Sequence, residues 1–257
     1  MSYIISFANQ KGGVGKTTSA INTASALTML GKKVLLVDLD PQGSSTSGVG
    51  IHKSSLSCTS YSVISGSCDI KDAIIQTKFK NLSLIPSNIS LAASEIEIAS
   101  QKDREYFLKN RIDELAKENL YDYIIIDCPP SLGLLTINAL TASRGVIVPI
   151  QCEYYSLEGL SQLMMTVKTV KQLYNRFLAV TGILITMYNP RYKLSTQVYA
   201  ELKKYYEDKL FKAKIPRSVV LSEAPSFGEP IQYYARYSKG SLEYQDLAKE
   251  IISRTEI

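Results

Sequence analysis

The segment that most constrains the fold is a glycine-rich loop near the start of the chain, GGVGKTT at residues 12–18. It follows an apolar run, YIISFA, and leads into an amphipathic stretch. A strand, a glycine loop ending in Lys-Thr and a helix form the context of a phosphate-binding loop. The helix that follows such a loop points its positive end toward the bound anion. The sequence therefore predicts a nucleotide site on a strand–loop–helix unit.

The loop provides a group for each part of the nucleotide phosphates. Gly12, Gly13 and Gly15 allow positive φ angles, so that backbone N–H groups can converge on phosphate oxygens. Lys16 supplies a positive charge for the β- and γ-phosphates of ATP, and the Thr17 hydroxyl is a ligand for Mg²⁺. The loop residues that we expect to bind ATP are Gly12, Gly13, Val14, Gly15, Lys16, Thr17 and Thr18.

Acidic residues follow two later apolar runs. LLVDLDPQG contains Asp38 and Asp40, and IIIDCPP contains Asp127. The carboxyl ends of parallel strands meet at one edge of a sheet, where such folds bind ligands. We expect Thr17, Asp40 and Asp127 to hold Mg²⁺, with Asp127 acting through water because Mg²⁺ keeps several waters. Asp40 lies beyond its strand, so we favour it over Asp38 for orienting the attacking water; the alternative for Asp38 is a structural role.

Short runs rich in Val, Ile and Leu alternate with amphipathic stretches along the whole chain. We expect strands at 3–8, 33–39, 82–87, 121–129, 145–151 and 178–188. We expect helices at 16–30, 103–118, 156–175 and 193–207, among others. This alternation is typical of a parallel sheet covered on both faces. The prediction is a single α/β P-loop NTPase domain over residues 1–257, with a mostly parallel twisted sheet and helices on both faces.

The sequence also indicates where in the cell the protein is located. No apolar run approaches the roughly 18 residues that a membrane span needs, and no signal-peptide pattern precedes the first strand. We therefore expect a cytoplasmic protein without a membrane partner. The serine-rich segment 44–67 lacks periodicity and is predicted to be an irregular, mobile surface segment.

The cysteines are scattered along the chain and form no C-x-x-C pair, which argues against a structural zinc site. We expect all of them to be reduced thiols. They are Cys58, Cys68, Cys128 and Cys152.

Positive charge is concentrated in one part of the sequence. Residues 168–217 carry 11 Lys and Arg against 3 Asp and Glu. Such an excess can mark a phosphate-rich partner, or it can be a solvated helix face rich in lysine. Charge alone leaves both interpretations open.

The motifs together resemble those of a known family. KGGVGKTT, VDLDPQG and IIIDCPP are similar to the motifs of the deviant Walker-A ATPases. Nearly the whole chain resembles the ParA/Soj partition ATPases, in the short form that lacks an N-terminal DNA-binding module. VPIQCEYYSLEGL, GILITMYNPR and IPRSVVLSEAPSFGEPI extend the resemblance to the partition branch of the MinD/ParA superfamily.

The resemblance implies a role for the second lysine of the loop. A family lysine at the position of Lys11 reaches the nucleotide bound by the partner subunit, in a homodimer that closes over two ATP molecules. The γ-phosphate concentrates negative charge at that interface, which a lysine in trans neutralises only when the partner is present. Lys11 is therefore expected to bind ATP and, with Lys16 and Asp40, to serve in catalysis.

Other positions follow from the same resemblance. Met187 and Pro216 match the adenine and ribose pocket. Glu153 lies near the dimer face in the family, and Gln42 and Gly43 match a switch that senses hydrolysis. For each of these residues, ordinary packing remains the alternative.

The resemblance also implies a function in chromosome or plasmid partition. The ATP dimer is expected to bind double-stranded DNA without sequence specificity and to associate with the nucleoid. A ParB-type centromere-binding partner is expected to stimulate hydrolysis and reset the cycle. Arg191 and Arg217 match positions that contact DNA phosphates, and Lys193, Lys203 and Lys204 are expected to add general attraction.

Two other function classes remain as alternatives. A positioning ATPase for another cargo would share all the motifs above. A MinD-like membrane-associated division regulator would end in a basic amphipathic helix, whereas this sequence ends in SLEYQDLAKEIISRTEI, with several acidic residues. An electron-transfer protein with an iron–sulfur cluster is disfavoured, because Cys128 and Cys152 do not match the ligand positions of that class.

Overall fold

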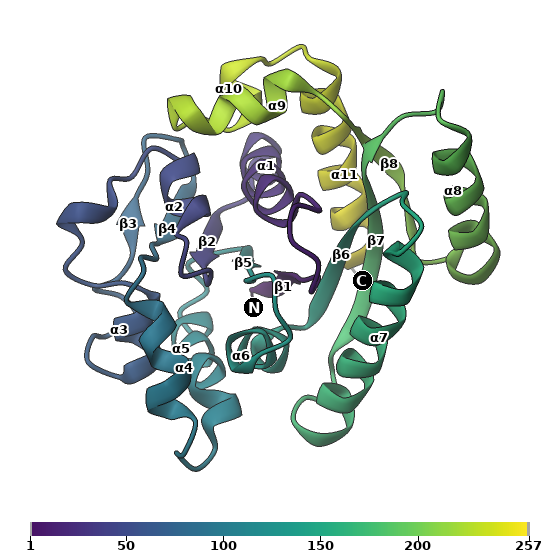
Figure 1. Cartoon of the computed structure of the whole chain (residues 1–257). Coiled ribbons are helices and arrows are strands. Elements are labelled where there is room, and N and C mark those ends of the chain that lie inside the picture. Colours follow the sequence, from purple (N-terminus) through teal and green to yellow (C-terminus); the bar gives the residue numbers. More distant parts are fainter. Residues whose placement is uncertain (1, 256–257) are drawn as a thin grey trace.

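The computed structural model describes residues 2–255, except for the side chain of Ser55. In this part of the chain, eight strands form one sheet in the order β3-β4-β2-β5-β1-β6-β7-β8. Their bounds are β1 Tyr3–Phe7, β2 Val34–Asp38, β3 Ile75–Gln76, β4 Leu82–Ile85, β5 Tyr123–Asp127, β6 Gly145–Gln151, β7 Ala179–Tyr188 and β8 Leu210–Pro216. All neighbouring strands are parallel except β3 and β4. The predicted mostly parallel sheet is confirmed (Figure 1).

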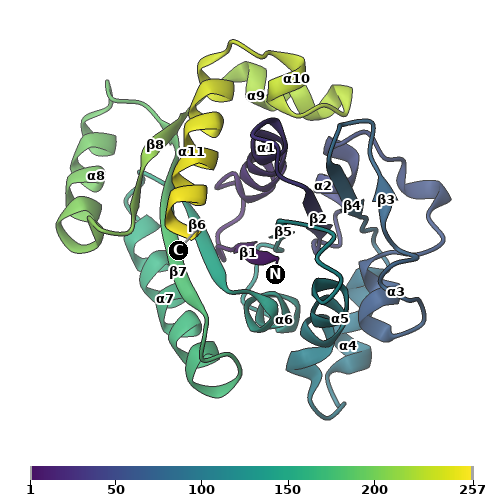
Figure 2. The ribbon, with the colours of Figure 1, turned by 180° about the vertical axis from the view of Figure 1, so that it is seen from behind.

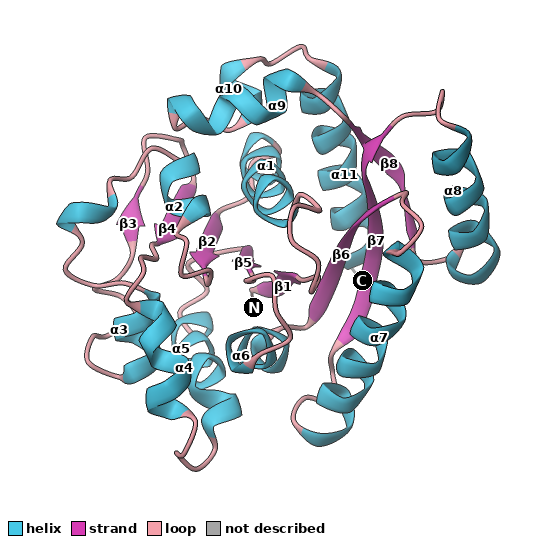
Figure 3. Ribbon diagram, viewed as in Figure 1, coloured by secondary structure: helices cyan, strands magenta, loops and turns pink. Residues whose placement is uncertain are grey.

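Helices cover both faces of the sheet, as predicted (Figure 3). One face packs against α1 (Lys16–Met29), α9 (Val219–Glu223), α10 (Ile231–Tyr234) and α11 (Lys239–Thr255). The other face packs against α3 (Ser60–Ser65), α4 (Leu91–Ile98), α5 (Phe107–Ala116), α6 (Leu134–Ala142), α7 (Ser156–Leu173) and α8 (Lys193–Tyr206). Seen from behind, α11 lies beside β8 and α1, which it also contacts (Figure 2).

The central strands are apolar throughout because both of their faces are covered. Every residue of β2 and β5 is buried. Successive side chains point to opposite faces of a strand, so Leu35 and Val37 join one core cluster while Val34 and Leu36 join the other. This two-sided burial explains the near-continuous runs of Val, Ile and Leu in the sequence.

The strand register brings the acidic residues together. Asp38 at the end of β2 is the register partner of Asp127 at the end of β5, and Phe7 at the end of β1 also pairs with Asp127. The phosphate loop follows β1 directly. The loop and the carboxylates therefore meet at the carboxyl edge of the sheet.

The segment 44–67 differs from the prediction of an irregular surface segment. It contains α2 (Ser44–Gly48), a 3₁₀ helix (Lys53–Ser55) and α3. Ser45 and Thr46 are completely buried, because their hydroxyls bond to carboxylates beneath them. The segment lacks apolar periodicity because some of its buried positions are occupied by serine and threonine instead of apolar residues.

The prediction of four reduced cysteines is also wrong in part. Cys58 and Cys68 form a disulfide with their Cα atoms 6.2 Å apart. The two cysteines flank α3, a short helix of 6 residues. Because the helix is so short, its two ends are close enough for the cysteine side chains to meet. Cys128 and Cys152 are free and buried, in agreement with the prediction for those two.

Candidate nucleotide-binding site

The phosphate loop connects β1 to α1 in the predicted manner. Gly13 and Gly15 have φ angles of +72° and +83°, a region that residues with a side chain rarely adopt. Gly12 does not have a positive φ, contrary to the expectation, and a Cβ atom there would meet nothing within 4 Å. Of the three loop glycines, Gly13 and Gly15 are therefore the ones whose backbone conformation requires glycine.

Side chains from neighbouring strands hold the loop in place. Thr186 Oγ1 of β7 donates a hydrogen bond to the carbonyl of Val14 at 2.8 Å. Gln151 Nε2 at the end of β6 donates to the carbonyl of Gly13 at 2.7 Å. These bonds use carbonyl groups of the loop and none of its N–H groups, which can therefore bind an anion. Sequence reasoning did not identify Thr186 or Gln151 as loop-positioning residues.

Lys16 is buried, with only 6% of its surface exposed. Its Nζ donates a hydrogen bond to the carbonyl of Lys11 at 3.0 Å. Burial lowers the pKa of Lys16, while the Asp127 carboxylate opposes that shift. A charged group held in low dielectric has few solvent competitors, so it can interact strongly with a bound phosphate.

The carboxylates at the sheet edge have different environments. Asp38 Oδ2 accepts hydrogen bonds from the backbone N–H and the hydroxyl of Thr46, both at 2.7 Å. Asp127 Oδ2 accepts one from the Ser45 hydroxyl at 2.8 Å. Asp40 accepts one from the backbone N–H of Gln42 at 2.9 Å. Asp38 thereby anchors α2, which favours the structural role for this residue and leaves Asp40 as the less engaged carboxylate.

Two buried carboxylates side by side favour the binding of a cation. Burial raises the pKa of both Asp38 and Asp127, and the charge of Asp38 raises the pKa of Asp127 further. Asp127 Oδ1 is buried and makes no hydrogen bond of normal geometry, although the Thr17 hydroxyl lies near enough to lower the pKa of Asp127. An orphaned carboxylate oxygen beside a threonine hydroxyl suits Mg²⁺, which prefers oxygen ligands.

Protein groups alone do not complete a metal site. Within residues 2–255, no group of three or more His, Cys, Asp or Glu side chains is arranged to hold a metal ion. Mg²⁺ is commonly held by one or two carboxylates together with substrate phosphates and water. Thr17 and Asp127 fit that arrangement, and Asp40 lies at the same edge of the sheet.

Lys11 stands at the rim of the loop in a setting unlike that of Lys16. Its Nζ forms an ion pair with Glu153, which follows β6. The two side chains are 40% and 48% exposed. The loop is fixed here by Asn9, which donates from Nδ2 to the carbonyl of Pro149 and accepts from the backbone N–H of Lys11. Lys11 is thus held by its own chain but remains accessible from outside.

A small cavity of about 170 Å³ adjoins the loop on the side of β7 and β8. Met187 and Pro216 line it together with Gly15 and Thr18 of the loop and its helix. The structure therefore brings the two residues matched to the adenine and ribose pocket next to the phosphate loop. Arg217 also lines this cavity, so one of the two arginines matched to DNA contacts lies at the nucleotide side.

Arg191 lies in the turn after β7 and is exposed. In the β7–β8 register Tyr188 pairs with Pro216, so Arg191 and Arg217 follow neighbouring strands at one edge of the sheet. Of the lysines expected to assist them, Lys203 of α8 forms an ion pair with Glu207, which directly follows that helix.

The chain matches known proteins over nearly its full length. Residues 2–180 match the model of a protein family described as an AAA domain. The sporulation initiation inhibitor protein Soj of Bacillus subtilis is 53% identical over 251 residues, which cover 98% of each chain. The chain belongs to the ParA/Soj family of partition ATPases.

Solved structures share the fold of this chain. A putative plasmid partition protein from Borrelia burgdorferi, bound to AMPPNP, has a TM-score of 0.84 and 28% identity, covering 98% of this chain and 99% of that one. A Mycobacterium smegmatis structure described as a cobyrinic acid a,c-diamide synthase, with an ATP analogue and magnesium, has a TM-score of 0.84. It is 37% identical and covers 97% of this chain and 93% of that one.

No helix among residues 2–255 is both long enough and apolar enough to cross a bilayer.

Proposed function

We propose that this ParA/Soj family member hydrolyses ATP with Mg²⁺ to drive a cycle of dimerisation and DNA binding in chromosome or plasmid partition. The observation that carries the proposal is the contrast between the two lysines of one loop. Lys16 is buried against the loop, whereas Lys11 is 40% exposed at its rim. In this cycle Lys16 would hold the nucleotide of its own subunit, and Lys11 would reach the nucleotide of a second subunit.

The nucleotide chemistry needs positioning and charge compensation more than covalent steps. The loop amides and Lys16 would bind the β- and γ-phosphates, and Met187 and Pro216 would contact the adenine and ribose. Mg²⁺, held by Thr17, Asp127 and Asp40, would neutralise charge on the phosphate oxygens. Asp40 would orient the attacking water, because Asp38 is fully engaged with Thr46 and Asp40.

ATP would join two copies of the chain face to face. Each Lys11 would leave Glu153 and contact the γ-phosphate bound by the partner, where a positive charge stabilises the transferring group. Loss of the γ-phosphate would remove this contact and weaken the dimer. Ser45 and Thr46 of α2 donate hydrogen bonds to Asp127 and Asp38 beside the phosphate loop. A change at the bound phosphate would therefore be transmitted through α2 to the Gln42–Gly43 switch segment, which precedes this helix.

The cargo assignment rests on relatives. Besides Soj, the chromosome partitioning protein ParA of Caulobacter vibrioides is 44% identical over 98% of this chain. We infer that the ATP dimer binds double-stranded DNA through Arg191 and Arg217, associates with the nucleoid in the cytoplasm, and is reset by a ParB-type partner. Contacts to phosphates carry no base information, so the binding would be independent of sequence.

Sedimentation with a non-hydrolysable ATP analogue tests the dimer. Wild-type chain should form a dimer, whereas Lys11→Ala should bind the nucleotide and remain a monomer. Lys102→Ala removes an exposed charge outside the site and should behave as wild type. Dimerisation of Lys11→Ala at the wild-type concentration would overturn the role in trans.

A salt series tests the DNA surface. Arg191→Ala should still dimerise but should bind a non-specific duplex more weakly, with a salt slope smaller by about one per subunit. An unchanged affinity and slope in Arg191→Ala, Arg217→Ala would place the DNA surface elsewhere. ATP-dependent dimers that bind no DNA would favour the positioning of another cargo.

A further inference from the structure

A second cavity lies at the opposite edge of the sheet from the phosphate loop. It has a volume of about 510 Å³. It is lined by Ser2, just before β1, by Ile4 of β1, and by Ser143 and Arg144, just before β6. The phosphate loop follows the other end of β1, so the length of this strand separates the two sites. Neither the motifs of the sequence nor the proposed ATPase cycle uses this cavity.

The interior of the cavity is apolar. Ile4 and Ala142 form part of the buried core beneath it, and Ala116 of α5 lines one wall. Phe177, in the loop after α7, also lines the cavity and is 69% exposed. Ligand pockets of about 300–1,000 Å³ with apolar walls and a few polar groups are typical of small-molecule sites.

Positive charge surrounds this apolar interior. Lys109, Lys117 and Arg144 line the cavity, against one acidic residue, Asp113, which pairs with Lys109. The side chain of Lys117 has no hydrogen bond or ion pair with the described residues 2–255. The Arg144 guanidinium lies 5.4 Å from the centre of the Tyr3 ring, a contact that leaves its charge unpaired. Two cationic groups are therefore available to a ligand.

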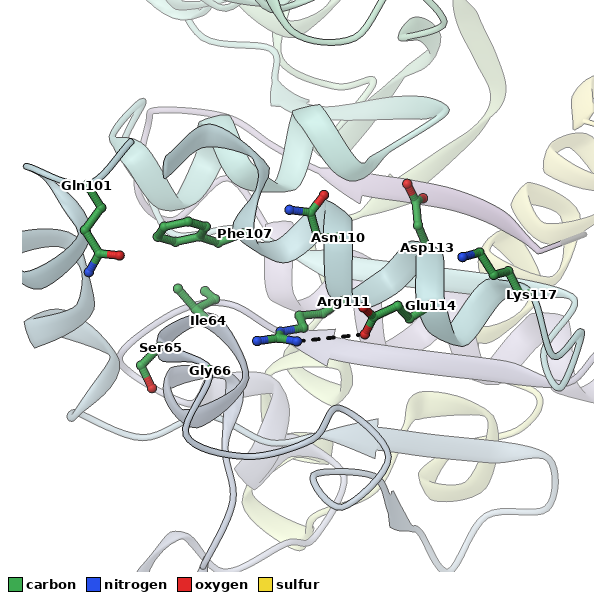
Figure 4. Close-up of a pocket in the computed structure, with 10 residues that line it drawn as sticks. All are labelled: Ile64, Ser65, Gly66, Gln101, Phe107, Asn110, Arg111, Asp113, Glu114 and Lys117. Atoms are coloured by element: carbon green, nitrogen blue, oxygen red, sulfur yellow. Dashed lines mark ion pairs between the residues drawn. The ribbon is translucent and has the colours of Figure 1, made fainter. Parts of the chain in front are cut away.

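A neighbouring cavity provides a useful contrast. It lies between α3 and α5, has a volume of about 630 Å³, and shares Asp113 and Lys117 with the first (Figure 4). Its Arg111 pairs with Glu114, so its acidic and basic residues balance. Of these two neighbouring cavities, the one of 510 Å³ combines apolar walls with an excess of positive charge.

We propose that the 510 Å³ cavity binds a small organic anion with an apolar body, of the class of aliphatic carboxylates. The hydrocarbon part would lie between Ala116 and Phe177, over Ile4 and Ala142. The carboxylate would contact Lys117 and Arg144 at the rim. The apolar body of the ligand would remove these walls from contact with water. Its carboxylate would pair with Lys117 and Arg144, which otherwise lack an anionic partner.

Decanoate, below its micelle-forming concentration, is the probe for this site. Titration of ¹⁵N-labelled protein should give saturable shifts at the amides of Thr141, Arg144 and Phe177, with a single site by calorimetry. Decyltrimethylammonium has the same chain with the opposite charge and should bind about tenfold more weakly or worse, a difference of about 1.4 kcal/mol. Acetate, which lacks the chain, should give no saturable shift.

Charge reversal provides the matched variants. Lys117→Glu with Arg144→Glu should weaken decanoate binding about tenfold or more, whereas Lys102→Glu should leave it unchanged. Phe177→Ser tests the apolar wall separately and should also weaken binding. All four positions are exposed, so the variants should melt at the wild-type temperature.

Three results would overturn the proposal. They are equal binding of the cationic and anionic probes, shifts centred away from the cavity, and wild-type affinity in the charge-reversed variant. Binding of a short acidic peptide without binding of decanoate would assign the cavity to a protein partner instead. These outcomes do not depend on ATP, so they are separate from the proposed ATPase cycle.

Discussion

Replacing Glu153 by glutamine removes the charge that holds Lys11 against its own chain. If Lys11 must leave Glu153 to reach the nucleotide of the partner, the variant should dimerise more readily with ATP. Both side chains are nearly half exposed, so each pair contributes only about 0.2–1 kcal/mol. Two pairs break for each dimer, which predicts a dissociation constant lower by about 2- to 30-fold.

Sedimentation equilibrium with a non-hydrolysable ATP analogue measures this constant directly. Glu201→Gln, which removes an exposed charge on α8, should leave the constant unchanged and serves as the matched control. Adding Glu153→Gln to Lys11→Ala should have no further effect, because the group that Glu153 restrains is already gone. Weaker dimerisation of Glu153→Gln would refute the reasoning, since Glu153 would then contribute a contact within the dimer.

Three further predictions concern the nucleotide site and the disulfide that spans α3. Lys16→Ala should abolish ATP binding in calorimetry, because it removes the buried charge that we propose holds the phosphates; retained micromolar affinity would contradict this role. Asp40→Ala should bind ATP and dimerise, but its hydrolysis rate should fall by about 100-fold or more. Hydrolysis at the wild-type rate would transfer the role to Asp38. Cys58→Ser with Cys68→Ser should lower the free energy of unfolding by about 3 kcal/mol, the entropy of closing a loop of this length. An unfolding curve of the wild type that does not respond to reductant would show that the bond is absent in solution.

The meeting of the acidic residues at the sheet edge was predictable from the sequence, because the carboxyl ends of parallel strands lie at one edge of the sheet. Asp38 and Asp127 are register partners for that reason, although they lie 89 positions apart in the sequence. β8 was missed because its edge position leaves Lys212 exposed and Lys214 partly exposed. These lysines interrupt the apolar run on which the strand predictions relied.

Contacts between distant polar side chains could not be predicted. Ser45 and Thr46 lie in a serine-rich segment without periodicity, and only the fold shows that their hydroxyls bond to buried carboxylates. The Lys11–Glu153 pair joins residues from two different loops. Such pairs depend on how loops meet at the sheet edge, which spacing along the chain does not encode.

DNA binding by the wild-type chain in different nucleotide states tests the central claim most directly. Anisotropy of a labelled non-specific duplex should be measured with the ATP analogue, with ADP and without nucleotide, across a salt series. Tight binding is expected only with the ATP analogue, with a salt slope of about −0.9 per phosphate neutralised. Equal binding in all three states, or no binding in any, would contradict an ATP-driven DNA-binding cycle.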